Sequence, residues 1–339
     1  MIRVGINGMG VIGRGLIRAI HDSVKKGEMR EERIEVVAFN DLFEAKQIAP
    51  LLSHDSSLGF FDAGVKYDSN GIIVNGKRIR GFKEKDAGKI KWNEAEVDVV
   101  VESSGFYAKN PGVEGHLESK VKKVIISAPS KFAKKTIVPG VNDLDYHQEN
   151  IVSCASCTTN CLAPIARALL TEFGMYNGFM TTIHSYTNDQ RLIDSPHKDP
   201  YRSFAASLNI IPTTTGAAKA IGGVLPELNG RMNGVAVRVP VPLGSLIDLV
   251  ISLDNKDRKV TREEVNSGIY RASMSYLSGA IEYREDPIVS SMILGNKCPS
   301  IFDSSRTQTI GNNIKVFSWY DNVTGYSNQV LKLIKLIGD

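Results

Sequence analysis

The sequence contains little cysteine, little net charge and no long apolar run. Its 339 residues include four cysteines, and three of them (Cys154, Cys157 and Cys161) are crowded together. This number and spacing do not form a disulfide framework, so we expect a reducing, cytoplasmic compartment. No apolar run approaches the ~18 residues that a membrane span requires. The chain begins directly with a strand-like run, which leaves no room for a signal peptide. These absences predict a protein without a membrane partner.

The small net charge argues against binding to nucleic acid or to a membrane surface. Lysine plus arginine number 41 and aspartate plus glutamate number 37, which gives a formal net charge of +4. So small an excess does not favour a nucleic-acid or membrane surface, although it suits small anions locally. The sequence shows no internal repeat and no low-complexity tract. Its length is sufficient for roughly two domains with a large core.

The amino-terminal half has the pattern of a dinucleotide-binding domain. A short apolar strand, Ile2–Asn7, leads into a G-x-G-x-x-G motif at Gly8–Gly13, and an apolar helical pattern follows through Ile17, Ile20 and Val24. Glycines at these positions permit a tight turn and let the backbone approach a pyrophosphate at the helix amino terminus. On its own the motif is also compatible with a simple tight turn.

An acidic residue follows the next predicted strand. Ile34–Phe39 reads as a buried strand and ends in Asn40-Asp41. A carboxylate at this point can accept the ribose hydroxyls of the adenosine and would repel a 2′-phosphate, so it favours NAD over NADP. The alternative for Asp41 is a solvated loop acid.

Two further strands, Val97–Val101 and Val124–Ile126, end in polar residues that include Ser104 and Ser127. In sheets of this kind, ligands bind at the carboxyl ends of the parallel strands. The first half therefore predicts an α/β fold with a Rossmann-type, doubly wound parallel sheet.

The stretch Ser153–Pro164, SCASCTTNCLAP, marks the start of the second half. An apolar run, Ile151-Val152, precedes it and a helical pattern follows, so Cys157 is predicted in the first turn of a helix. Backbone N–H groups and the positive end of the helix dipole favour a thiolate there, which is the nucleophilic form of cysteine. Two alternatives are a small packed residue and a metal site built on C-x2-C-x3-C. A closed thiolate site needs about four ligands, which this segment does not supply.

Beyond Cys157 the pattern changes to longer alternating runs. Phe179–Ser185, Val235–Val239 and Leu246–Leu253 predict strands of a mixed or antiparallel sheet with helices on one side, which is an α+β domain. We place the boundary near Ser156. The predicted domains are residues 1–155 with 321–339, and residues 156–320.

The second half also supplies a candidate base and candidate anion ligands. His184 lies in a predicted strand and could deprotonate a cysteine-bound substrate, although a lone strand histidine is more often structural. Arg238 interrupts an apolar run, and a buried arginine needs an anionic partner such as a phosphate or a structural carboxylate. Thr215-Gly216 precedes an alanine-rich helix, and Thr187 follows the candidate base.

These segments resemble those of one family, the phosphorylating glyceraldehyde-3-phosphate dehydrogenases. SCASCTTNCLAP resembles the family's active-site segment, and GINGMGVIGR, FNDL, ESSG and KKVIISAP resemble its cofactor-domain segments in the same order. The resemblance covers nearly the whole chain. It implies NAD-dependent oxidative phosphorylation of D-glyceraldehyde 3-phosphate through a cysteine thioester, with a small phosphorylated aldehyde and inorganic phosphate as partners. It also implies a homotetramer in which the segment Asn188–Asn209 packs between subunits.

The resemblance assigns roles residue by residue. It makes Cys157 the nucleophile and His184 the base, and it predicts no metal. It implies the phosphate and substrate ligands Ser156, Thr158, Thr187, Arg202, Thr215, Gly216 and Arg238. It implies the cofactor ligands Gly8, Gly10, Val11, Ile12, Gly13, Asp41, Lys85, Ser104, Ser127 and Asn322.

Some positions differ from the family pattern. Val11 replaces an arginine, the 200–204 loop keeps only Arg202 of an arginine cluster, and Val323-Thr324 replaces an acid and a tryptophan. Ser195 before Pro196 weakens the inference of strict NAD use. Three other hypotheses are an erythrose-4-phosphate dehydrogenase, an NADP-preferring variant and a catalytically silent binding protein of the same fold.

Overall fold

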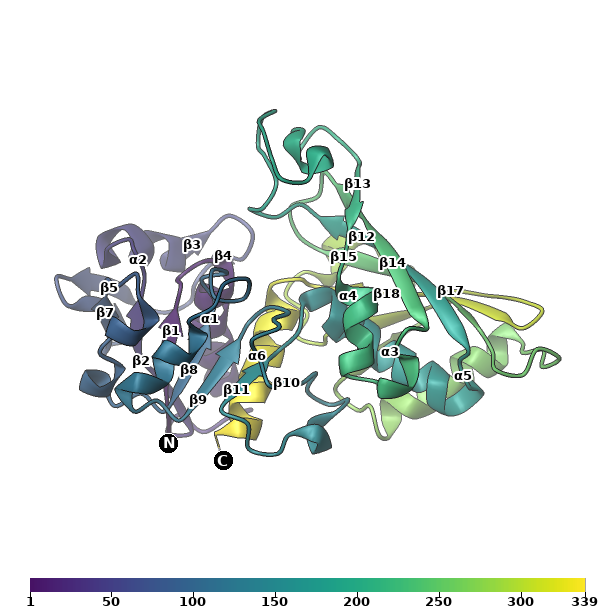
Figure 1. The fold of residues 1–339 in the computed structure, drawn as a ribbon, viewed down its shortest axis with the longest axis horizontal. Helices are drawn as coiled ribbons and strands as arrows, with labels where there is room; N and C mark the ends of the chain where they lie inside the picture. The colour runs from purple at the N-terminus through teal and green to yellow at the C-terminus, as the bar shows by residue number, and fades with distance from the viewer. Residues whose placement is uncertain (339) are drawn as a thin grey trace. The chain divides into compact units, whose positions relative to one another are not determined.

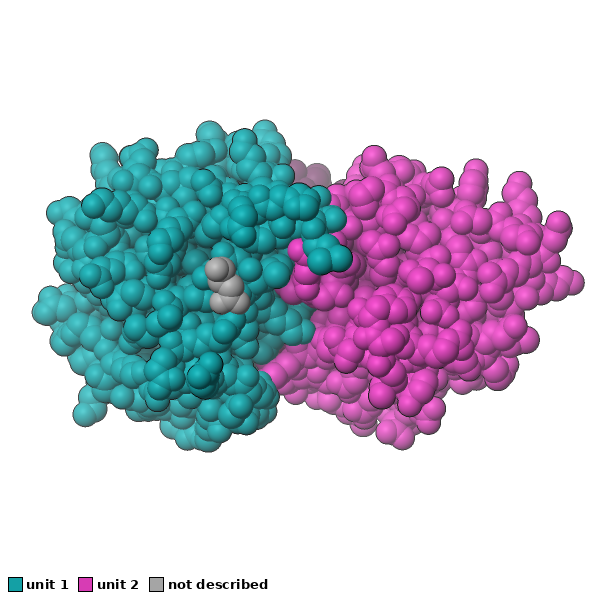
Figure 2. Space-filling view, turned by 90° about the horizontal axis from the view of Figure 1, so that it is seen from below, with its two compact units in different colours: residues 1–137, 144–155, 327–339 teal, residues 138–143, 156–326 magenta. Residues whose placement is uncertain are grey.

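The computed structural model describes residues 1–338 and divides the chain into two compact units, which are coloured separately in Figure 2. The first unit contains residues 1–137 and 144–155 and the chain from Ser327 onward. The second contains residues 138–143 and 156–326. Within residues 1–338, none of the helices has both the length and the apolar character needed to cross a membrane.

The first unit is built on one large sheet. The strands of this unit are β1 (Ile2–Asn7), β2 (Ile34–Asn40), β3 (His54–Asp55), β4 (Gly59–Phe60), β5 (Val65–Asp68), β6 (Gly71–Val74), β7 (Lys77–Phe82), β8 (Val99–Glu102), β9 (Lys123–Ile126), β10 (Lys135–Thr136) and β11 (Ile151–Ser153). The sheet has the order β10-β11-β9-β8-β1-β2-β7-β6-β5, and β3 pairs separately with β4. From β10 to β7 the pairs are parallel, and β5, β6 and β7 form an antiparallel meander.

Helices flank this sheet (Figure 1). The α-helices are α1 (Val11–Lys25), α2 (Ala45–Ser53) and, after its first three residues, α6 (Thr324–Ile337). Short 3-10 helices are η1 (Ala87–Lys89), η2 (Trp92–Ala95), η3 (Val113–Ser119) and η4 (Asp143–Asp145).

The central strands are apolar because they are buried on both faces. Val99, Val100 and Val101 of β8 have at most 1% of their surface exposed, as expected for strands of a parallel sheet covered on both sides. Between β6 and β7, Asn75 and Gly76 both adopt positive φ angles (50° and 82°), which is the geometry of a two-residue hairpin turn. The predicted α/β fold is confirmed.

The second unit has a seven-stranded mixed sheet with the order β13-β14-β12-β15-β18-β17-β16. Its strands are β12 (Asn177–Ser185), β13 (Ile211–Thr214), β14 (Met232–Val239), β15 (Ser245–Ser252), β16 (Ile281–Arg284), β17 (Ser300–Ile310) and β18 (Asn313–Tyr320). The pairs β12–β14 and β16–β17 are parallel and the others are antiparallel. The predicted mixed sheet is therefore confirmed, although β13, β16 and β17 were not predicted.

The helices of the second unit are α3 (Cys157–Phe173), α4 (Ala217–Ala220) and α5 (Arg262–Met274), with 3-10 helices η5 (Pro200–Ser203), η6 (Ile221–Gly223), η7 (Pro226–Leu228) and η8 (Ser290–Ile293). The helix α3 packs against β15, β17 and β18, and α4 packs against β14. The long connection from β12 to β13 contains only η5 and is drawn mostly as loop in Figure 1.

The two faces of this sheet differ. Along β15, Ile247, Leu249 and Ile251 are buried, whereas Val250 between them is 37% exposed. On β12, Phe179 lies opposite Val250 and is 68% exposed. Because successive side chains of a strand point to opposite faces, the sheet has one covered face and one apolar face that is open to solvent.

The limits of the compact units differ from the predicted domain limits at the carboxyl end. We predicted the return to the first domain at residue 321, but the chain joins the first unit only at Ser327. The reason lies in the start of α6. Asp321 accepts hydrogen bonds from the backbone N–H groups of Gly295, Val323 and Thr324, and these bonds hold the first turn of α6 in the second unit.

Candidate active site

Cys157 occupies the first position of α3, and local chemistry fixes it there. Ala155, with a φ of 55°, turns the chain after β11. The Ser156 hydroxyl then caps the helix by accepting a hydrogen bond from the Thr159 backbone N–H at 3.0 Å. Serine is a favoured cap because it satisfies one of the N–H groups that the first helical turn leaves unpaired.

His184 faces this cysteine from β12. Thr182 and His184 lie two residues apart and are both buried, so they point to the same covered face as α3. The His184 Nε2 atom lies 3.6 Å from the Cys157 Sγ atom. A nucleophile and a base at this separation form the pair that thiol catalysis requires.

Tyr320, at the end of β18, supports both partners and was not predicted as a site residue. Its hydroxyl lies 2.8 Å from the hydroxyls of Thr158, which follows Cys157, and Thr182, which lies two residues before His184. Its ring meets the His184 imidazole edge-to-face, with centroids 5.8 Å apart. The only sequence signal was a tyrosine in the last position of an apolar strand.

Arg238 contacts the other nitrogen of the imidazole. The parallel register of β12 and β14 places Arg238 directly beside His184. One guanidinium nitrogen, Nη1, donates to the Ser185 carbonyl at 2.8 Å and lies 2.7 Å from His184 Nδ1. Within residues 1–338, Arg238 forms no ion pair with a carboxylate, and its buried Nε has no hydrogen-bond partner. Asp189 acts on this charge only through space, so within residues 1–338 the guanidinium has no carboxylate in direct contact.

Burial and charge act on the two catalytic candidates as follows. Burial raises the pKa of the Cys157 thiol, whereas the charge of Arg238 and the hydrogen bonds from Thr158 lower it. The helix start alone therefore does not produce a thiolate. Burial, together with the charges of Arg238 and Arg202, lowers the pKa of His184 to about 3, against a hydrogen bond to Ser185 that raises it. The imidazole is neutral at pH 7.

Four predicted phosphate ligands, Arg202, Thr215, Gly216 and Thr187, make their hydrogen bonds with residues other than Cys157 and His184. Arg202 binds Asp189 of its own loop and donates from Nε to the Thr213 hydroxyl of β13 at 3.0 Å, so acidic and polar groups already surround it. The Thr215 hydroxyl accepts a hydrogen bond from the Ala217 backbone N–H at 3.2 Å just before α4, and Gly216 between them is the cap residue of that helix. The Thr187 backbone donates to Gln190. Within residues 1–338, no hydrogen bond joins these residues to Cys157 or His184.

Asn322 lies just beyond Tyr320 and is buried. Its Oδ1 atom accepts hydrogen bonds from the Ser185 hydroxyl at 3.0 Å and the Gly244 backbone at 3.1 Å. This arrangement fixes the side-chain amide and turns its NH₂ donor away from these contacts. A fixed amide donor is suited to binding a carbonyl oxygen.

In the first unit, the loop between β1 and α1 fits a dinucleotide phosphate. Gly8 has a φ of 97°, and a Cβ atom there would lie 2.5 Å from the Ser104 backbone nitrogen. A Cβ at Gly13 would lie 2.3 Å from the Gly8 carbonyl oxygen, whereas one at Gly10 would meet no atom within 4 Å. Gly10 caps α1 without a side-chain partner, and the first turn of α1 carries no acid. The tight turn and the open, uncapped helix start are what a bound pyrophosphate needs. Val11 and Ile12, the first residues of that turn, present their backbone there.

The other predicted cofactor residues lie at the ends of β2, β8 and β9, except Lys85. Asp41 accepts hydrogen bonds from the backbone N–H groups of Met9 (2.7 Å) and Phe43 (3.0 Å), so it braces the glycine loop. Ser104 donates to the Glu102 carboxylate and Ser127 donates to the Glu102 carbonyl. Lys85 is exposed, and its carbonyl accepts from Tyr107.

Glu102 is the centre of a buried network that the sequence reasoning did not identify. Its carboxylate accepts hydrogen bonds from Asn7, Ser104 and His116, and Asn7 in turn accepts from Asn40 at 2.8 Å. These residues join the ends of β1, β2 and β8 beneath the glycine loop. The signal was present as three polar residues, each ending an apolar strand.

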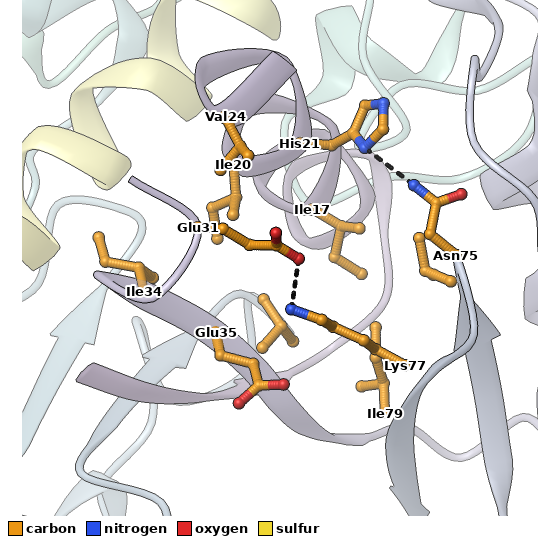
Figure 3. A pocket seen from close by; sticks show the side chains of 12 residues that line it. Ile17, Ile20, His21, Val24, Glu31, Ile34, Glu35, Asn75, Lys77 and Ile79 are labelled. Atoms are coloured by element: carbon orange, nitrogen blue, oxygen red, sulfur yellow. Dashed lines mark hydrogen bonds and ion pairs between the residues drawn. The ribbon is translucent and has the colours of Figure 1, made fainter. Parts of the chain in front are cut away.

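A small cavity in the first unit lies apart from these residues, between α1 and the sheet (Figure 3). Its volume is about 130 Å³, whereas ligand pockets measure roughly 300–1,000 Å³. Two pairs of its polar groups bind each other, Lys77 with Glu31 at 2.6 Å and Asn75 with His21 Nδ1 at 3.5 Å. The cavity is too small for a dinucleotide. Elsewhere within residues 1–338, no group of three or more His, Cys, Asp or Glu side chains is arranged to hold a metal ion.

Comparison with known proteins finds similarity to one family in both halves of the chain. The family described as glyceraldehyde 3-phosphate dehydrogenase, NAD binding domain, matches residues 2–110, and the C-terminal domain of the same enzyme matches residues 156–322. Glyceraldehyde-3-phosphate dehydrogenase 1 of Bacillus subtilis is 49% identical over 339 residues, which cover 99% of this chain and 98% of the relative. The enzyme of Geobacillus stearothermophilus is 48% identical over the same shares of both chains.

A third relative, glyceraldehyde-3-phosphate dehydrogenase 2 of Streptomyces avermitilis, is 47% identical over 100% of this chain and 99% of its own length. The match to the NAD binding domain confirms the predicted cofactor. The relatives span essentially the full length of the chain, and both domain families match in the predicted order. The chain therefore belongs to the glyceraldehyde-3-phosphate dehydrogenase family.

Proposed function

We propose that this protein oxidises and phosphorylates D-glyceraldehyde 3-phosphate to 1,3-bisphosphoglycerate, with NAD as the electron acceptor. The observation that carries the proposal is the arrangement around His184. One imidazole nitrogen lies 3.6 Å from a cysteine sulfur, and the other lies beside an arginine whose buried Nε has no hydrogen-bond partner in the described residues. A thiol nucleophile, a base and a buried cation with free donor capacity are the groups that a phosphorylated aldehyde requires.

The chemistry on sulfur proceeds in two stages. The Cys157 sulfur adds to the aldehyde carbon, and the resulting oxyanion takes a proton to give a hemithioacetal. His184 then removes the hydroxyl proton during the oxidation that leaves a thioester. NAD, when bound, supplies the acceptor for the hydride that this oxidation releases. The Cys157 backbone N–H at the start of α3 and the His184 imidazole are placed to stabilise the oxyanions.

Inorganic phosphate completes the reaction by attacking the thioester carbon and expelling the Cys157 thiolate. We assign Arg238 and Thr187 to the phosphate that the substrate already carries. Ser156, Thr158, Thr215 and Gly216 are assigned to the attacking phosphate, with Arg202 as a further cation. The Thr158 hydroxyl contacts Tyr320 and the Arg202 guanidinium contacts Asp189, so the attacking phosphate would have to share or replace these contacts.

The remaining cofactor assignments follow from the NAD-binding family and the sequence resemblance. The backbone of Gly8–Gly13 would hold the pyrophosphate, and Asp41 would accept ribose hydroxyls with the lone pairs that Met9 and Phe43 leave available. Lys85, Ser104, Ser127 and Asn322 complete the proposed set. We propose the functional division predicted from the sequence, residues 1–155 with 321–339 for NAD binding and 156–320 for catalysis, although residues 321–326 pack in the second compact unit.

The test is formation of NADH from glyceraldehyde 3-phosphate, measured by absorbance with and without inorganic phosphate. Wild type should show sustained, phosphate-dependent turnover, and Cys157→Ser should lose it by at least about 10⁴-fold because a serine hydroxyl is not ionised at this site. Cys298→Ser, the same substitution at a cysteine whose sulfur contacts the Ser300 carbonyl instead of His184, is the matched control and should retain activity. Turnover by Cys157→Ser would refute the assignment.

The same assay separates the alternatives. Preference for erythrose 4-phosphate would identify the related four-carbon enzyme, and preference for NADP would overturn the role given to Asp41. No turnover with any of these substrates, although NAD binds, would identify a binding protein of the same fold.

We also propose a cytoplasmic homotetramer. Four apolar side chains of the segment between β12 and β13, namely Leu192, Ile193, Leu208 and Ile210, are each at least 70% exposed. The open face of the second sheet adds Phe179, Val235 and Val250. Apolar surface of this extent usually marks a protein interface. Because the same surface is present on every copy, self-association would cover it.

A further inference from the structure

Arg14, near the start of α1, has a largely buried side chain and belongs to none of the proposed sets of ligands. Its Nη1 atom donates to the Met9 carbonyl at 3.0 Å, and its Nη2 atom donates to the Asp55 carboxylate at 2.6 Å. Only 12% of the Arg14 side chain and 7% of the Asp55 side chain are exposed. The guanidinium therefore connects the glycine loop to β3 through two direct bonds.

Asp55 is a fixed anchor for this guanidinium. Its other carboxylate oxygen, Oδ1, accepts hydrogen bonds from the backbone N–H groups of Ser57 at 2.9 Å and Leu58 at 3.1 Å. Burial alone would raise the pKa of Asp55, but the hydrogen bonds from Arg14, Ser57 and Leu58 hold it below its ordinary value. The carboxylate is therefore ionised at neutral pH and balances the charge of Arg14, which leaves little net positive charge for a ligand.

Two successive peptide groups of the glycine loop differ in their partners. The Gly8–Met9 peptide is bonded on both sides, since its carbonyl accepts from the Ser103 hydroxyl at 2.7 Å and its N–H donates to Asp41 at 2.7 Å. The Met9–Gly10 peptide is bonded only through its carbonyl, by Arg14. Within residues 1–338, its N–H group has no hydrogen-bond partner.

The geometry of the peptide bond sets the direction of that N–H group. In a trans peptide the carbonyl oxygen and the amide hydrogen point in opposite directions. Because Arg14 holds the Met9 carbonyl, the Gly10 N–H must point away from the guanidinium. The space around Gly10 is open, since a Cβ atom there would meet no atom within 4 Å. The unpaired N–H groups of the first turn of α1 follow directly.

We propose that Arg14 is a positioning residue for the diphosphate of NAD, because its bond to the Met9 carbonyl orients the Gly10 N–H toward the place where the diphosphate binds. Asp55 keeps the guanidinium in position. Arg14 acts through the Met9–Gly10 peptide, and its charge is already balanced. This role rests on the proposed NAD-dependent function and adds to it.

The experiment is calorimetric titration of the full chain with ADP-ribose, which carries the diphosphate, and with adenosine, which lacks it. Adenosine is measured by its displacement of ADP-ribose. Arg14→Met keeps the length and the apolar stem of the side chain but has no N–H donor. It should bind ADP-ribose at least about tenfold more weakly than wild type, the effect of one lost hydrogen bond, and adenosine within about twofold.

Arg18→Met is the matched control. Arg18 lies one turn later on α1, is also buried, and donates to the carbonyls of Leu52 at 2.8 Å and Gly59 at 3.0 Å. Within residues 1–338 it makes no hydrogen bond to the glycine loop. This variant loses a buried cation from the same helix, yet it should bind ADP-ribose as tightly as wild type.

Arg14→Lys separates geometry from charge. Lysine keeps the positive charge but lacks the planar donor fork that binds Met9 and Asp55 together. It should therefore also bind ADP-ribose more weakly than wild type, and it decides the outcome if Arg14→Met does not fold.

An unchanged affinity for ADP-ribose in folded Arg14→Met would overturn the proposal, and so would wild-type affinity in Arg14→Lys. An equal loss for adenosine, or an equal loss in Arg18→Met, would assign the effect to general loosening of the first unit and would also overturn it. If adenosine does not displace ADP-ribose from wild type, the comparison with Arg18→Met decides.

The NADH assay on the same preparations keeps the two claims apart. Turnover by wild type, together with unaltered ADP-ribose binding by Arg14→Met, would reject only the role given to Arg14. Absence of both NAD binding and turnover in wild type would reject the proposed function itself.

Discussion

At the scale of single residues, the fold changes the protonation of His184 within a pH range that stability measurements can reach. Its pKa is lowered to about 3 in the folded protein, chiefly by burial and then by the Arg238 charge, whereas an unfolded histidine has a pKa of about 6.5. Between these values the unfolded chain binds more protons than the folded chain. The stabilising contribution of His184 is complete above about pH 6.5 and is lost as the pH falls towards 3.

We therefore expect His184→Gln to flatten the pH dependence of stability. Wild type should lose up to about 1.4 kcal/mol per pH unit through this group as the pH falls below 6.5, and the variant should lack that slope. The measurement is the free energy of unfolding by urea between pH 7 and pH 5. His147→Gln, at an exposed histidine, should follow wild type. Parallel profiles for wild type and His184→Gln would contradict the expectation.

Tyr320 offers a second test at this scale. Its buried hydroxyl connects Thr158 and Thr182, so Tyr320→Phe would leave two buried hydroxyls without that partner. We expect a loss of about 1–3 kcal/mol in the free energy of unfolding and a slower NADH-forming reaction. Tyr283→Phe, in the same sheet but without such a bridge, should stay within about 0.5 kcal/mol of wild type. Equal effects of the two substitutions would show that the bridge contributes nothing.

At the scale of elements, the β1–α1 turn separates folding from cofactor binding. Gly8 combines a positive φ with a Cβ position 2.5 Å from the Ser104 backbone, whereas the Cβ position of Gly10 is open. The two glycines belong to one motif, yet only Gly8 is needed for the backbone of the turn to fold. The open space at Gly10 is available to a bound ligand such as the pyrophosphate of NAD.

Gly8→Ala should destabilise the protein by more than about 2 kcal/mol, because both the backbone strain and the backbone clash oppose it. Gly10→Ala should cost no more than about 1 kcal/mol, the usual penalty for alanine at a helix cap, but should weaken NAD binding at least tenfold. Thermal unfolding and NAD titration measure the two effects. Tight NAD binding by a folded Gly10→Ala variant would rule out a pyrophosphate over that glycine.

At the scale of the whole molecule, the open face of the second sheet is the feature that a single chain leaves unexplained. Phe179 and Val250 face each other across β12 and β15 on that side, and the connection before β13 adds further exposed apolar residues. Burial of apolar surface contributes roughly 25 cal/mol per Å², so a contact between copies through these residues would be strongly favoured.

Phe179→Glu should consequently disrupt the proposed homotetramer, because a carboxylate would have to be desolvated at the interface. Light scattering after size-exclusion chromatography should give a mass below that of wild type. Leu144→Glu replaces a residue that is 93% exposed in the first unit and should leave the mass unchanged. A monomeric wild type, or a Phe179→Glu protein of unchanged mass, would refute the proposed assembly.

The sequence by itself determined the features that depend on neighbouring residues. The Gly8–Gly13 turn, the capped start of α3 at Cys157 and the alternating strand that holds His184 follow from conformational preferences and periodicities that act over a few residues. The order of these segments was also enough to identify the fold class and the family.

Only the tertiary structure decided which side chains meet. His184 and Arg238 are 54 residues apart, and Thr158 and Tyr320 are 162 apart. Their contacts depend on the register of β12 against β14 and on the packing of β18 against α3. The Glu102 network depends in the same way on three strand ends meeting. Local periodicity fixes the face on which a side chain lies but not its partner, because strand register is set by the packing of the whole sheet.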